Sequence, residues 1–196
     1  MQLSLITLGH VHEQDINALT AYCTRLEQLV LDVQPRASLS QHRAEFNRAV
    51  DAATNDWIVI VRERETIDGA LAKEIVENAA EGGGATPKAW GFRIRTVPVY
   101  AGKPLRVETE SEVRLFHRRH YIRFAEEFAI QGTIVRLQNA FRAVTFDSAE
   151  AHRAYLEKNA VPHSTLRRVL LFLKYARTLD RNTLRYIWTE AGFDKG

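Results

Sequence analysis

Cysteine is almost absent from this sequence: Cys23 is the single cysteine among 196 residues. An intrachain disulfide is therefore impossible, and this cysteine usage is typical of a reducing compartment. No apolar run approaches the roughly 20 residues that a membrane-spanning helix needs, and the first residues lack the basic segment of a secretory signal. We therefore expect a cytoplasmic protein. Cys23 lies among apolar residues of a predicted helix, which indicates a core position rather than a catalytic one.

Several functional signatures are also missing. The sequence has no Walker loop, no G-x-G-x-x-G motif, and neither a helix-turn-helix nor a zinc-finger pattern, so we expect no nucleic-acid partner. His10 and His12 follow the first predicted strand and could contact a ligand, although two histidines are a weak metal signal. The basic and aromatic strip His117–Phe124 could hold a phosphate or an anionic sugar, but a solvated strand edge is the preferred interpretation.

Net charge is low, at +3, but it is unevenly distributed. From His163 to Gly196 there are seven Lys and Arg residues against three Asp and Glu residues, which gives this tail a charge of +4. The apolar segment Val169–Ala176 follows Arg167 and Arg168 within it. This segment could lie on an anionic membrane surface. The preferred alternative is a helix packed against the sheet or against a second copy in a homodimer.

The first half of the sequence alternates strand and helix patterns. A helix cap at Asp68 is indicated because its carboxylate can accept the free amides of the first turn. Such alternation predicts a parallel, wound sheet. The predicted strands are Leu3–Leu8, Val30–Val33 and Asp56–Val61, and the predicted helices are Gln14–Leu29, Ser40–Ala53 and a third from Asp68 to about Ala80.

The second half changes to antiparallel strands and then to helices. The expected fold is therefore α/β, with a central sheet that is mixed and mainly parallel. Residues 1–146 are expected to form this domain, and residues 147–196 a C-terminal helical extension packed on it. The predicted strands are Trp90–Val99 and Lys103–Glu108 around a turn at Ala101–Gly102, then Glu112–Phe116, Gly132–Leu137 and Phe141–Phe146. The predicted helices run from Asp147 to about Asn159, from Thr165 to Thr178 and from Thr183 to Ala191.

The most informative stretch is Asp56–Glu65, D-W-I-V-I-V-R-E-R-E. Its apolar run predicts a strand that is covered on both faces, and four charged residues follow without a spacer. Strands of this kind deliver charge to the carboxyl edge of an α/β sheet, where ligands bind. The alternative is a strand that simply ends in solvent.

This stretch resembles the D-W-I-L-x-L-D-A-D-E segment of family-two glycosyltransferases, the inverting sugar-nucleotide enzymes, and in particular the bacterial lipopolysaccharide-core type. Weaker likenesses follow in the same order along nearly the whole chain. They are Asn47, which resembles the R/K-N before this strand; Gly91–Arg95; Glu112–Arg118, which resembles R-L-F-R-R; Glu127–Gly132, which resembles H-E-x-x-x-x-G; and Arg136–Ser148.

The resemblance implies a nucleotide-diphospho-sugar transferase (GT-A) fold, which is a Rossmann-like sandwich. It also implies a sugar nucleotide as donor, and a saccharide or lipid-linked acceptor at the cytoplasmic side of the inner membrane. Asp32 would then contact the nucleotide, and Glu127 would be the general base that deprotonates the acceptor hydroxyl. In that family, two carboxylates of a D-x-D motif hold a divalent metal on the diphosphate.

The sequence departs from the family at these carboxylates, because Arg62 and Arg64 stand in their place. Arginine remains protonated and cannot bind a metal, so we expect no divalent metal. Glu126 and Ala143 replace two histidines of the motifs, and the segment between Asp32 and Asn47 is shorter than in the family. Three alternatives stay open: a transferase in which Arg62 and Arg64 bind the diphosphate directly, a self-neutralising charge cluster, and a non-catalytic binding or scaffold protein.

Overall fold

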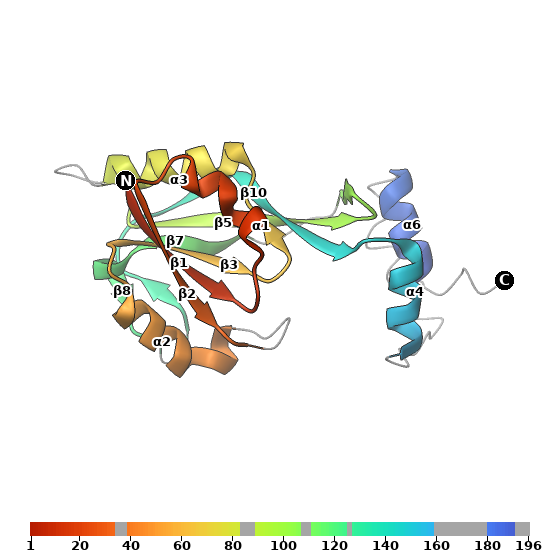
Figure 1. The fold of residues 1–196 in the computed structure, drawn as a ribbon, viewed down its shortest axis with the longest axis horizontal. Helices are drawn as coiled ribbons and strands as arrows, with labels where there is room; N and C mark the ends of the chain where they lie inside the picture. Colours follow the sequence, from red (N-terminus) through yellow and green to blue (C-terminus); the bar gives the residue numbers. More distant parts are fainter. Residues whose placement is uncertain (34–38, 83–88, 107–110, 125–126, 159–179, 191–196) are drawn as a thin grey trace. The chain divides into compact units, whose positions relative to one another are not determined.

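The computed structural model describes residues 1–33, 39–82, 89–106, 111–124, 127–158 and 180–190 (Figure 1). The chain divides into two compact units, which are described separately. The first comprises Met1–Thr96 and Glu110–Phe141, and the second comprises Val97–Thr109 and Arg142–Gly196. The expected boundary between residues 146 and 147 lies near the last of these divisions, whereas no sequence pattern marks residues 97–109 as part of the C-terminal unit.

The first unit is built around a sheet. Two of its strands, β5 and β10, end in the second unit. In chain order the elements are β1 (Gln2–Leu8), α1 (Glu13–Thr20), β2 (Arg25–Leu31), the 3-10 helix η1 (Leu39–His42), α2 (Arg43–Ala52), β3 (Trp57–Arg62), β4 (Glu65–Thr66), α3 (Gly69–Gly82), β5 (Gly91–Tyr100), β7 (Ser111–His117), the 3-10 helix η2 (Arg118–His120), β8 (Tyr121–Ile122), β9 (Ala129–Ile130) and β10 (Ile134–Phe146).

The main sheet is mixed, with the order β2-β1-β3-β7-β5-β10-β4. Strand β1 pairs in parallel with β2 on one side and with β3 on the other. Antiparallel pairing begins where β7 joins β3, and β5 is antiparallel to β7. Strands β8 and β9 form a separate antiparallel pair. The fold is therefore α/β with a mixed sheet, which is compatible with a Rossmann-like arrangement.

Helices cover both faces of this sheet, with α1 and α3 on one face and α2 on the other (Figure 1). The apolar run of β3 supplies both faces, because successive side chains of a strand point to opposite sides. Val59 and Val61 pack with α1 and α3, and Ile58 and Ile60 pack with α2. All four side chains are fully buried. The prediction of a strand covered on both faces is confirmed.

The predicted helix Gln14–Leu29 is wrong in its second half. Helix α1 ends at Thr20, and Arg25–Leu31 forms strand β2. Leu26 and Leu29 have helical spacing, but the register with β1 places them in a strand, on opposite faces of the sheet. Cys23 consequently lies between the helix and the strand, partly buried against the core, rather than in the middle of a helix.

The last strand also differs from the prediction. Gly132–Leu137 and Phe141–Phe146 were expected as two strands, but Ile134–Phe146 is one continuous strand, β10. The link between its two apolar segments is held in the strand because Glu74 of α3 binds Gln138 and Asn139. The carboxylate of Glu74 accepts the backbone N–H groups of Gln138 and Asn139 at 2.7 and 2.8 Å.

Side-chain oxygens accept free N–H groups at the starts of three helices, and the predicted cap at Asp68 is confirmed. The Asp68 carboxylate accepts the Leu71 N–H at 2.9 Å at the start of α3. Asp180 accepts the N–H groups of Asn182 and Thr183 at 3.0 and 3.1 Å. At the start of α4, the Ser148 hydroxyl accepts the Ala151 N–H at 3.1 Å.

The second unit contains α4 (Ala149–Lys158), α6 (Arg181–Glu190) and β6 (Lys103–Pro104), together with the ends of β5 and β10. The expected turn at Ala101–Gly102 joins β5 to β6, with φ angles of 48° and 74°. The fully buried His152 of α4 stacks between the rings of Phe146 and Tyr186, at centroid distances of 4.2 and 5.3 Å.

The predicted helix Thr165–Thr178 and its apolar segment Val169–Ala176 lie outside the described residues. The possible membrane surface and the possible homodimer through C-terminal helices therefore stay predictions. In the part of the chain that the structure describes, every helix is too short or too polar to cross a bilayer.

Candidate functional site at the carboxyl edge of the sheet

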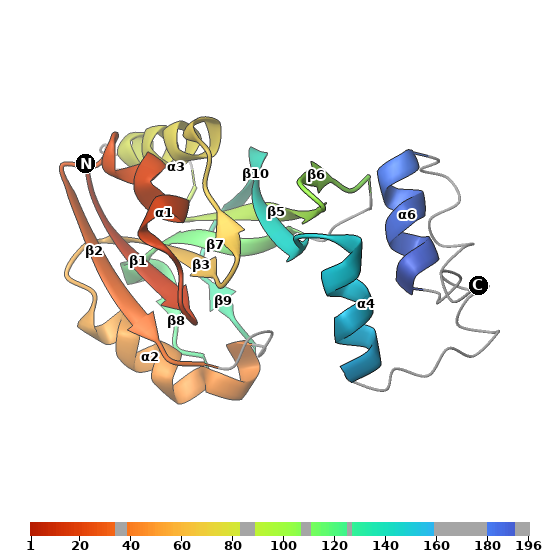
Figure 2. The same ribbon diagram turned by 45° about the vertical axis from the view of Figure 1, so that its right-hand side comes forward.

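Three parallel strands end side by side at one edge of the sheet. In the register, Leu8 of β1 lies between Leu31 of β2 and Arg62 of β3. Figure 2 shows β1 and β2 running together to this edge. The chain leaves β1 for β2 on one side and returns to β3 on the other, which makes this edge a topological switch point. The next residues of the three strands are Gly9, Asp32 and Glu63.

Backbone contacts fix the starts of the three loops. The Gly9 N–H donates to the Leu31 carbonyl at 2.9 Å, and the Glu63 N–H donates to the Leu8 carbonyl at 2.8 Å. Gly9 has a φ of 80°, and a Cβ there would lie 3.1 Å from Oε2 of Glu63. A side chain at position 9 would therefore strain the backbone and press against this carboxylate.

Strand β3 turns back sharply at its carboxyl end. Glu63 and Arg64 form the turn, and Glu65 begins β4. Arg64 is exposed and has a φ of 66°, which is uncommon for a residue with a side chain. The turn is held because the Glu65 carboxylate accepts the Arg62 N–H at 2.8 Å. Of the four charged residues predicted to follow the strand, Glu63 and Arg64 thus form the turn, and Arg62 and Glu65 lie on either side of it.

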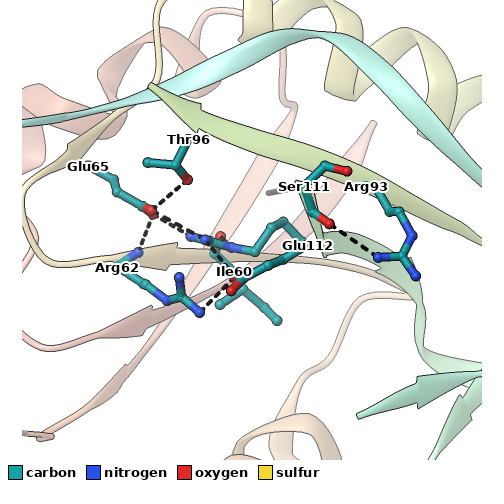
Figure 3. A network of polar contacts seen from close by, with 8 residues as sticks. Ile60, Arg62, Glu65, Arg93, Thr96, Ser111 and Glu112 are labelled. Atoms are coloured by element: carbon teal, nitrogen blue, oxygen red, sulfur yellow. Dashed lines mark hydrogen bonds and ion pairs between the residues drawn. The ribbon is translucent and has the colours of Figure 1, made fainter. Parts of the chain in front are cut away.

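Glu65 and Arg114 form a buried ion pair beneath this turn, with side chains 3% and 1% exposed. The Glu65 carboxylate accepts both terminal N–H groups of the Arg114 guanidinium, and it also accepts the Thr96 hydroxyl at 3.2 Å (Figure 3). Nε of Arg114 donates to the Ile60 carbonyl at 3.0 Å. The guanidinium carbon lies 4.7 Å from the centre of the Phe141 ring. Both charges are therefore paired and hydrogen bonded, as burial requires.

A β-bulge places Arg114 in this position. Phe92 of β5 pairs with Leu115 of β7, but the next residue, Arg93, pairs with Val113. Arg114 is therefore the extra residue on β7, and bulges of this kind redirect a side chain and frequently lie beside functional sites. A regular strand would have kept Arg114 in the ladder and given its side chain a different direction.

Arg62 has a second, more exposed ion pair. Its Nη2 lies 2.7 Å from Oε2 of Glu112, and the two side chains are 34% and 47% exposed. The same Glu112 oxygen is 3.5 Å from Nη1 of Arg114. Figure 3 shows the Arg62 side chain reaching Glu112 while the Arg62 backbone meets Glu65. The charges of this turn are thus neutralised by residues of β7 and not only by one another.

The two arginine side chains at this turn cannot ligate a divalent metal. Arg62 and Arg64 carry no donor atoms for a cation. The Glu65 carboxylate already accepts hydrogen bonds from Arg62, Thr96 and Arg114. Across the described residues, no group of three or more His, Cys, Asp or Glu side chains is placed to hold a metal ion.

Asp32 and Glu127 lie in different surroundings. Asp32 is exposed and directly follows β2, so it shares the carboxyl edge with Arg62. Glu127 is exposed beside β9, next to Phe128, whose ring packs on Phe46 of α2 at 5.8 Å. Arg62 follows Ile60 on the same face of β3, and Ile60 belongs to the cluster that contains Phe46. Among the described residues, no hydrogen bond or ion pair joins Glu127 to Arg62.

Asn47 positions the segment that leads to Glu127. Its side-chain amide donates to the Phe124 carbonyl at 3.0 Å and accepts the Phe124 N–H at 3.0 Å. The Tyr121 hydroxyl also donates to the Asn47 carbonyl oxygen. Asn47, singled out through the family resemblance, therefore ties α2 to the loop 121–124 and is itself buried.

The two histidines after β1 lie at the mouth of a groove. The rings of His10 and His12 meet edge to face, with centroids 5.0 Å apart, as expected if both point to one side. The groove has a volume of about 550 Å³ and runs between α1 and β2. Its lining combines polar and apolar side chains: His10, Val11, His12, Glu13, Ile16, Asn17, Thr20, Leu26, Gln28 and Val30.

The basic strip lies at the opposite, amino edge of β3. His117 pairs in register with Trp57, and Arg119 and Arg118 lie 3.7 and 4.0 Å from the Asp56 carboxylate. Burial lowers the pKa of His117, and the positive charges of its neighbours act in the same direction, while Asp56 opposes them. Nδ1 of His117 accepts the Arg119 N–H at 3.3 Å. The strip is therefore tied into the fold instead of lining the switch point.

Sequence reasoning missed Arg114 and Glu112 as members of the site. The signal was an arginine between Val113 and Leu115, inside an apolar strand pattern. A buried arginine needs a buried anion, and Glu65 is a carboxylate that lies just after the predicted strand Asp56–Val61. The pairing itself could not be predicted, because it depends on the bulge in β7.

A scan against models of known protein families finds no match to this chain, and a search of curated proteins finds no significant match. The fold, the charged carboxyl edge and the motif resemblance are therefore the features that indicate a function.

Proposed function

We propose that this chain is a glycosyltransferase-like protein with a GT-A type of fold that binds a sugar nucleotide without a divalent metal. The proposal depends on one observation: at the carboxyl edge of the sheet, the adjacent ends of β2, β1 and β3 bring Asp32, Gly9 and Arg62 together. A switch point with a guanidinium at its rim suits an anionic ligand. The ordered motif resemblance adds the sugar-nucleotide class.

The dimensions of this edge fit a nucleoside diphosphate. Neighbouring strands lie about 4.8 Å apart, so the ends of β2 and β3 are separated by about 10 Å across β1. Asp32 at one end would accept hydrogen bonds from the base or ribose. Arg62 at the other end would pair with phosphate oxygens through its planar fork of donors. Arg64, exposed at the tip of the turn, would supply a second guanidinium.

Glu127 is the proposed general base of a transfer reaction. An acceptor hydroxyl oxygen would attack the anomeric carbon while the bond from that carbon to the diphosphate oxygen breaks. The nucleoside diphosphate leaves with the bonding electrons, and the hydroxyl proton passes to the Glu127 carboxylate. Arg62 and Arg64 would balance the charge that develops on the leaving group. The acceptor would be a saccharide or a lipid-linked glycan.

A non-catalytic binding or scaffold protein is the second candidate. The observation that favours it is the pairing of Arg62 with Glu112, which already neutralises the guanidinium. In this alternative the fold keeps the sugar-nucleotide scaffold, but it binds a saccharide or another protein instead of turning over a donor.

Calorimetric titration with UDP and GDP, in EDTA and then with manganese, tests binding. We expect binding in EDTA that manganese does not strengthen, and we expect Arg62→Gln to abolish it. Arg48→Gln is the matched control, because Arg48 is an exposed arginine of α2 with a nearby glutamate. The absence of binding to any nucleotide, or an absolute need for manganese, would contradict the proposal.

Turnover separates the two candidates. Hydrolysis of UDP-glucose and GDP-mannose is measured for the unmodified protein and for Glu127→Gln. Turnover that Glu127→Gln removes, with nucleotide binding unchanged, supports the transferase. Binding without any turnover supports the non-catalytic candidate.

A further inference from the structure

The two ion pairs of the network differ sharply in their exposure to solvent. Glu65 and Arg114 are almost completely buried, whereas the Arg62 and Glu112 side chains are about one third and one half exposed. An exposed ion pair contributes little to stability because water competes for both charges. Breaking a buried pair leaves an uncompensated charge in the interior. The Arg62–Glu112 contact is therefore the one that a ligand can replace.

We propose that Glu112 is a built-in competitor for the anion site, a carboxylate that occupies Arg62 until a phosphate group displaces it. The inference depends on the proposed function, because it concerns the same guanidinium. In the unliganded protein, Glu112 satisfies Arg62 at 2.7 Å. Binding then exchanges a carboxylate for a phosphate at the same donors. An anion therefore binds only if it interacts with Arg62 more strongly than Glu112 does.

The displaced carboxylate does not lose its positive neighbour. Oε2 of Glu112 is already 3.5 Å from Nη1 of Arg114, so it stays near one guanidinium when it leaves the other. Arg114 in turn keeps its contacts with Glu65 and the Ile60 carbonyl. The exchange therefore leaves the buried pair intact, and the loop after β3 does not need to move.

This arrangement selects for ligands with more than one negative charge. A carboxylate ligand would exchange one negative charge for another of the same size and gain little. A diphosphate brings at least two charges and several acceptor oxygens, and guanidinium forks bind such groups strongly. The expected ligands are therefore nucleoside diphosphates and their sugar derivatives, with simple carboxylates excluded.

The test measures the affinity of UDP and of inorganic pyrophosphate, in EDTA, by titration calorimetry. Replacing the competitor in Glu112→Gln should tighten binding of both by roughly two- to fivefold, the range that a surface ion pair represents. Glu77→Gln is the matched control, because it removes an exposed carboxylate that pairs with Lys73 on α3. Glu112→Ala is the second variant, and circular dichroism confirms that each variant is folded.

The outcomes separate the two proposals. Tighter binding in both Glu112 variants but not in Glu77→Gln supports competition, and so does binding that becomes measurable only in them. Unchanged or weaker binding in folded Glu112 variants, with binding still lost in Arg62→Gln, overturns the competition and leaves the proposed function standing. Binding that does not depend on Arg62, or none in any variant, overturns both. Pyrophosphate binding that both Glu112 variants tighten, without any UDP binding, supports competition but contradicts the nucleotide assignment.

Discussion

The two ends of β3 join the same neighbouring strand by different contacts. At the carboxyl end, ion pairs connect Arg62 and the following turn to Glu112 and Arg114 of β7. At the amino end, the Trp57 ring contacts the His117 ring with centroids 5.2 Å apart. Trp57 and His117 are buried there, while Arg118 and Arg119 pair with Asp56 at the surface. The carboxyl end differs because the partly exposed guanidinium of Arg62 lies beside a fully buried ion pair, and it is the end where we propose that a ligand binds.

The largest effect should follow from breaking the buried pair. Glu65→Ala leaves Arg114 as an unpaired charge in the interior, so we expect the free energy of unfolding to fall by about 3–5 kcal/mol. Urea unfolding followed by circular dichroism measures this change. A loss below about 1 kcal/mol would contradict the assignment of Glu65 and Arg114 as a structural pair.

A double variant tests whether apolar side chains can replace the buried ion pair. Glu65→Leu combined with Arg114→Met removes both charges and fills the space with apolar side chains. Replacements of this kind are frequently neutral or stabilising, so the double variant should recover most of the stability that Glu65→Ala loses. If it is less stable than Glu65→Ala, the bulge and its neighbours need the ion pair itself.

At the amino end, the corresponding test is Gly132→Ala. Gly132 has a φ of 104°, and an added Cβ would lie 2.6 Å from Cδ1 of Trp90. The Trp90 ring stacks on His120 at a centroid distance of 3.6 Å, so it cannot move without disturbing the ring cluster. We expect a loss of about 1–3 kcal/mol in urea unfolding. Gly69→Ala is the control, since nothing lies within 4 Å of its added Cβ, and it should cost almost nothing.

The amino end should also respond to pH. The pKa of His117 is lowered, chiefly by burial, so between the folded pKa and about 6.5 the unfolded chain binds a proton that the folded protein excludes. This part of the stability is complete above pH 6.5 and is lost as the pH falls through the folded pKa. The Arg119 N–H, which His117 accepts, would lose its acceptor on protonation.

Urea unfolding at pH 8, 7, 6 and 5 measures the dependence. His117→Phe keeps a ring in contact with Trp57 but does not titrate, so its stability should change less between pH 7 and pH 5. His12→Gln changes an exposed histidine at the other edge, and it should keep the dependence of the unmodified protein. Equal slopes for all three proteins would contradict the role of His117.

Sequence patterns predicted the elements of the first unit well where a strand is buried on both faces or where a side chain caps the start of a helix. The apolar run in β3 and the carboxylate of Asp68 are local signals, and both predictions are confirmed. The failures came where tertiary pairing decides. Leu26 and Leu29 fit a helix by spacing, but pairing with β1 makes them a strand. The continuity of β10 depends on Glu74 of α3, which is distant in sequence.

The candidate site was predictable in position but not in its pairing. The charged end of β3 indicated the carboxyl edge, and Asp32 and Arg62 do lie there. The partners of Arg62 and Glu65 come from β7, and a one-residue bulge determines which β7 side chains reach them. Such a bulge leaves no recognisable residue pattern, because no glycine marks it. The role proposed for Glu127 as a general base stays a prediction.

The smallest effect on stability should follow from Arg62→Gln. Its guanidinium meets Glu112 in a partly exposed pair, so we expect a loss of less than about 1 kcal/mol in urea unfolding. The contact that holds the turn uses the Arg62 backbone N–H, and this bond to Glu65 survives the substitution. The same variant should lose nucleotide binding, which would separate binding from stability at this end of β3. The free energy of unfolding could instead fall by nearly as much as in Glu65→Ala, and by much more than in Arg48→Gln. Arg62 would then be as important for stability as the buried pair, and the Arg62–Glu112 contact could not be the one that a ligand replaces.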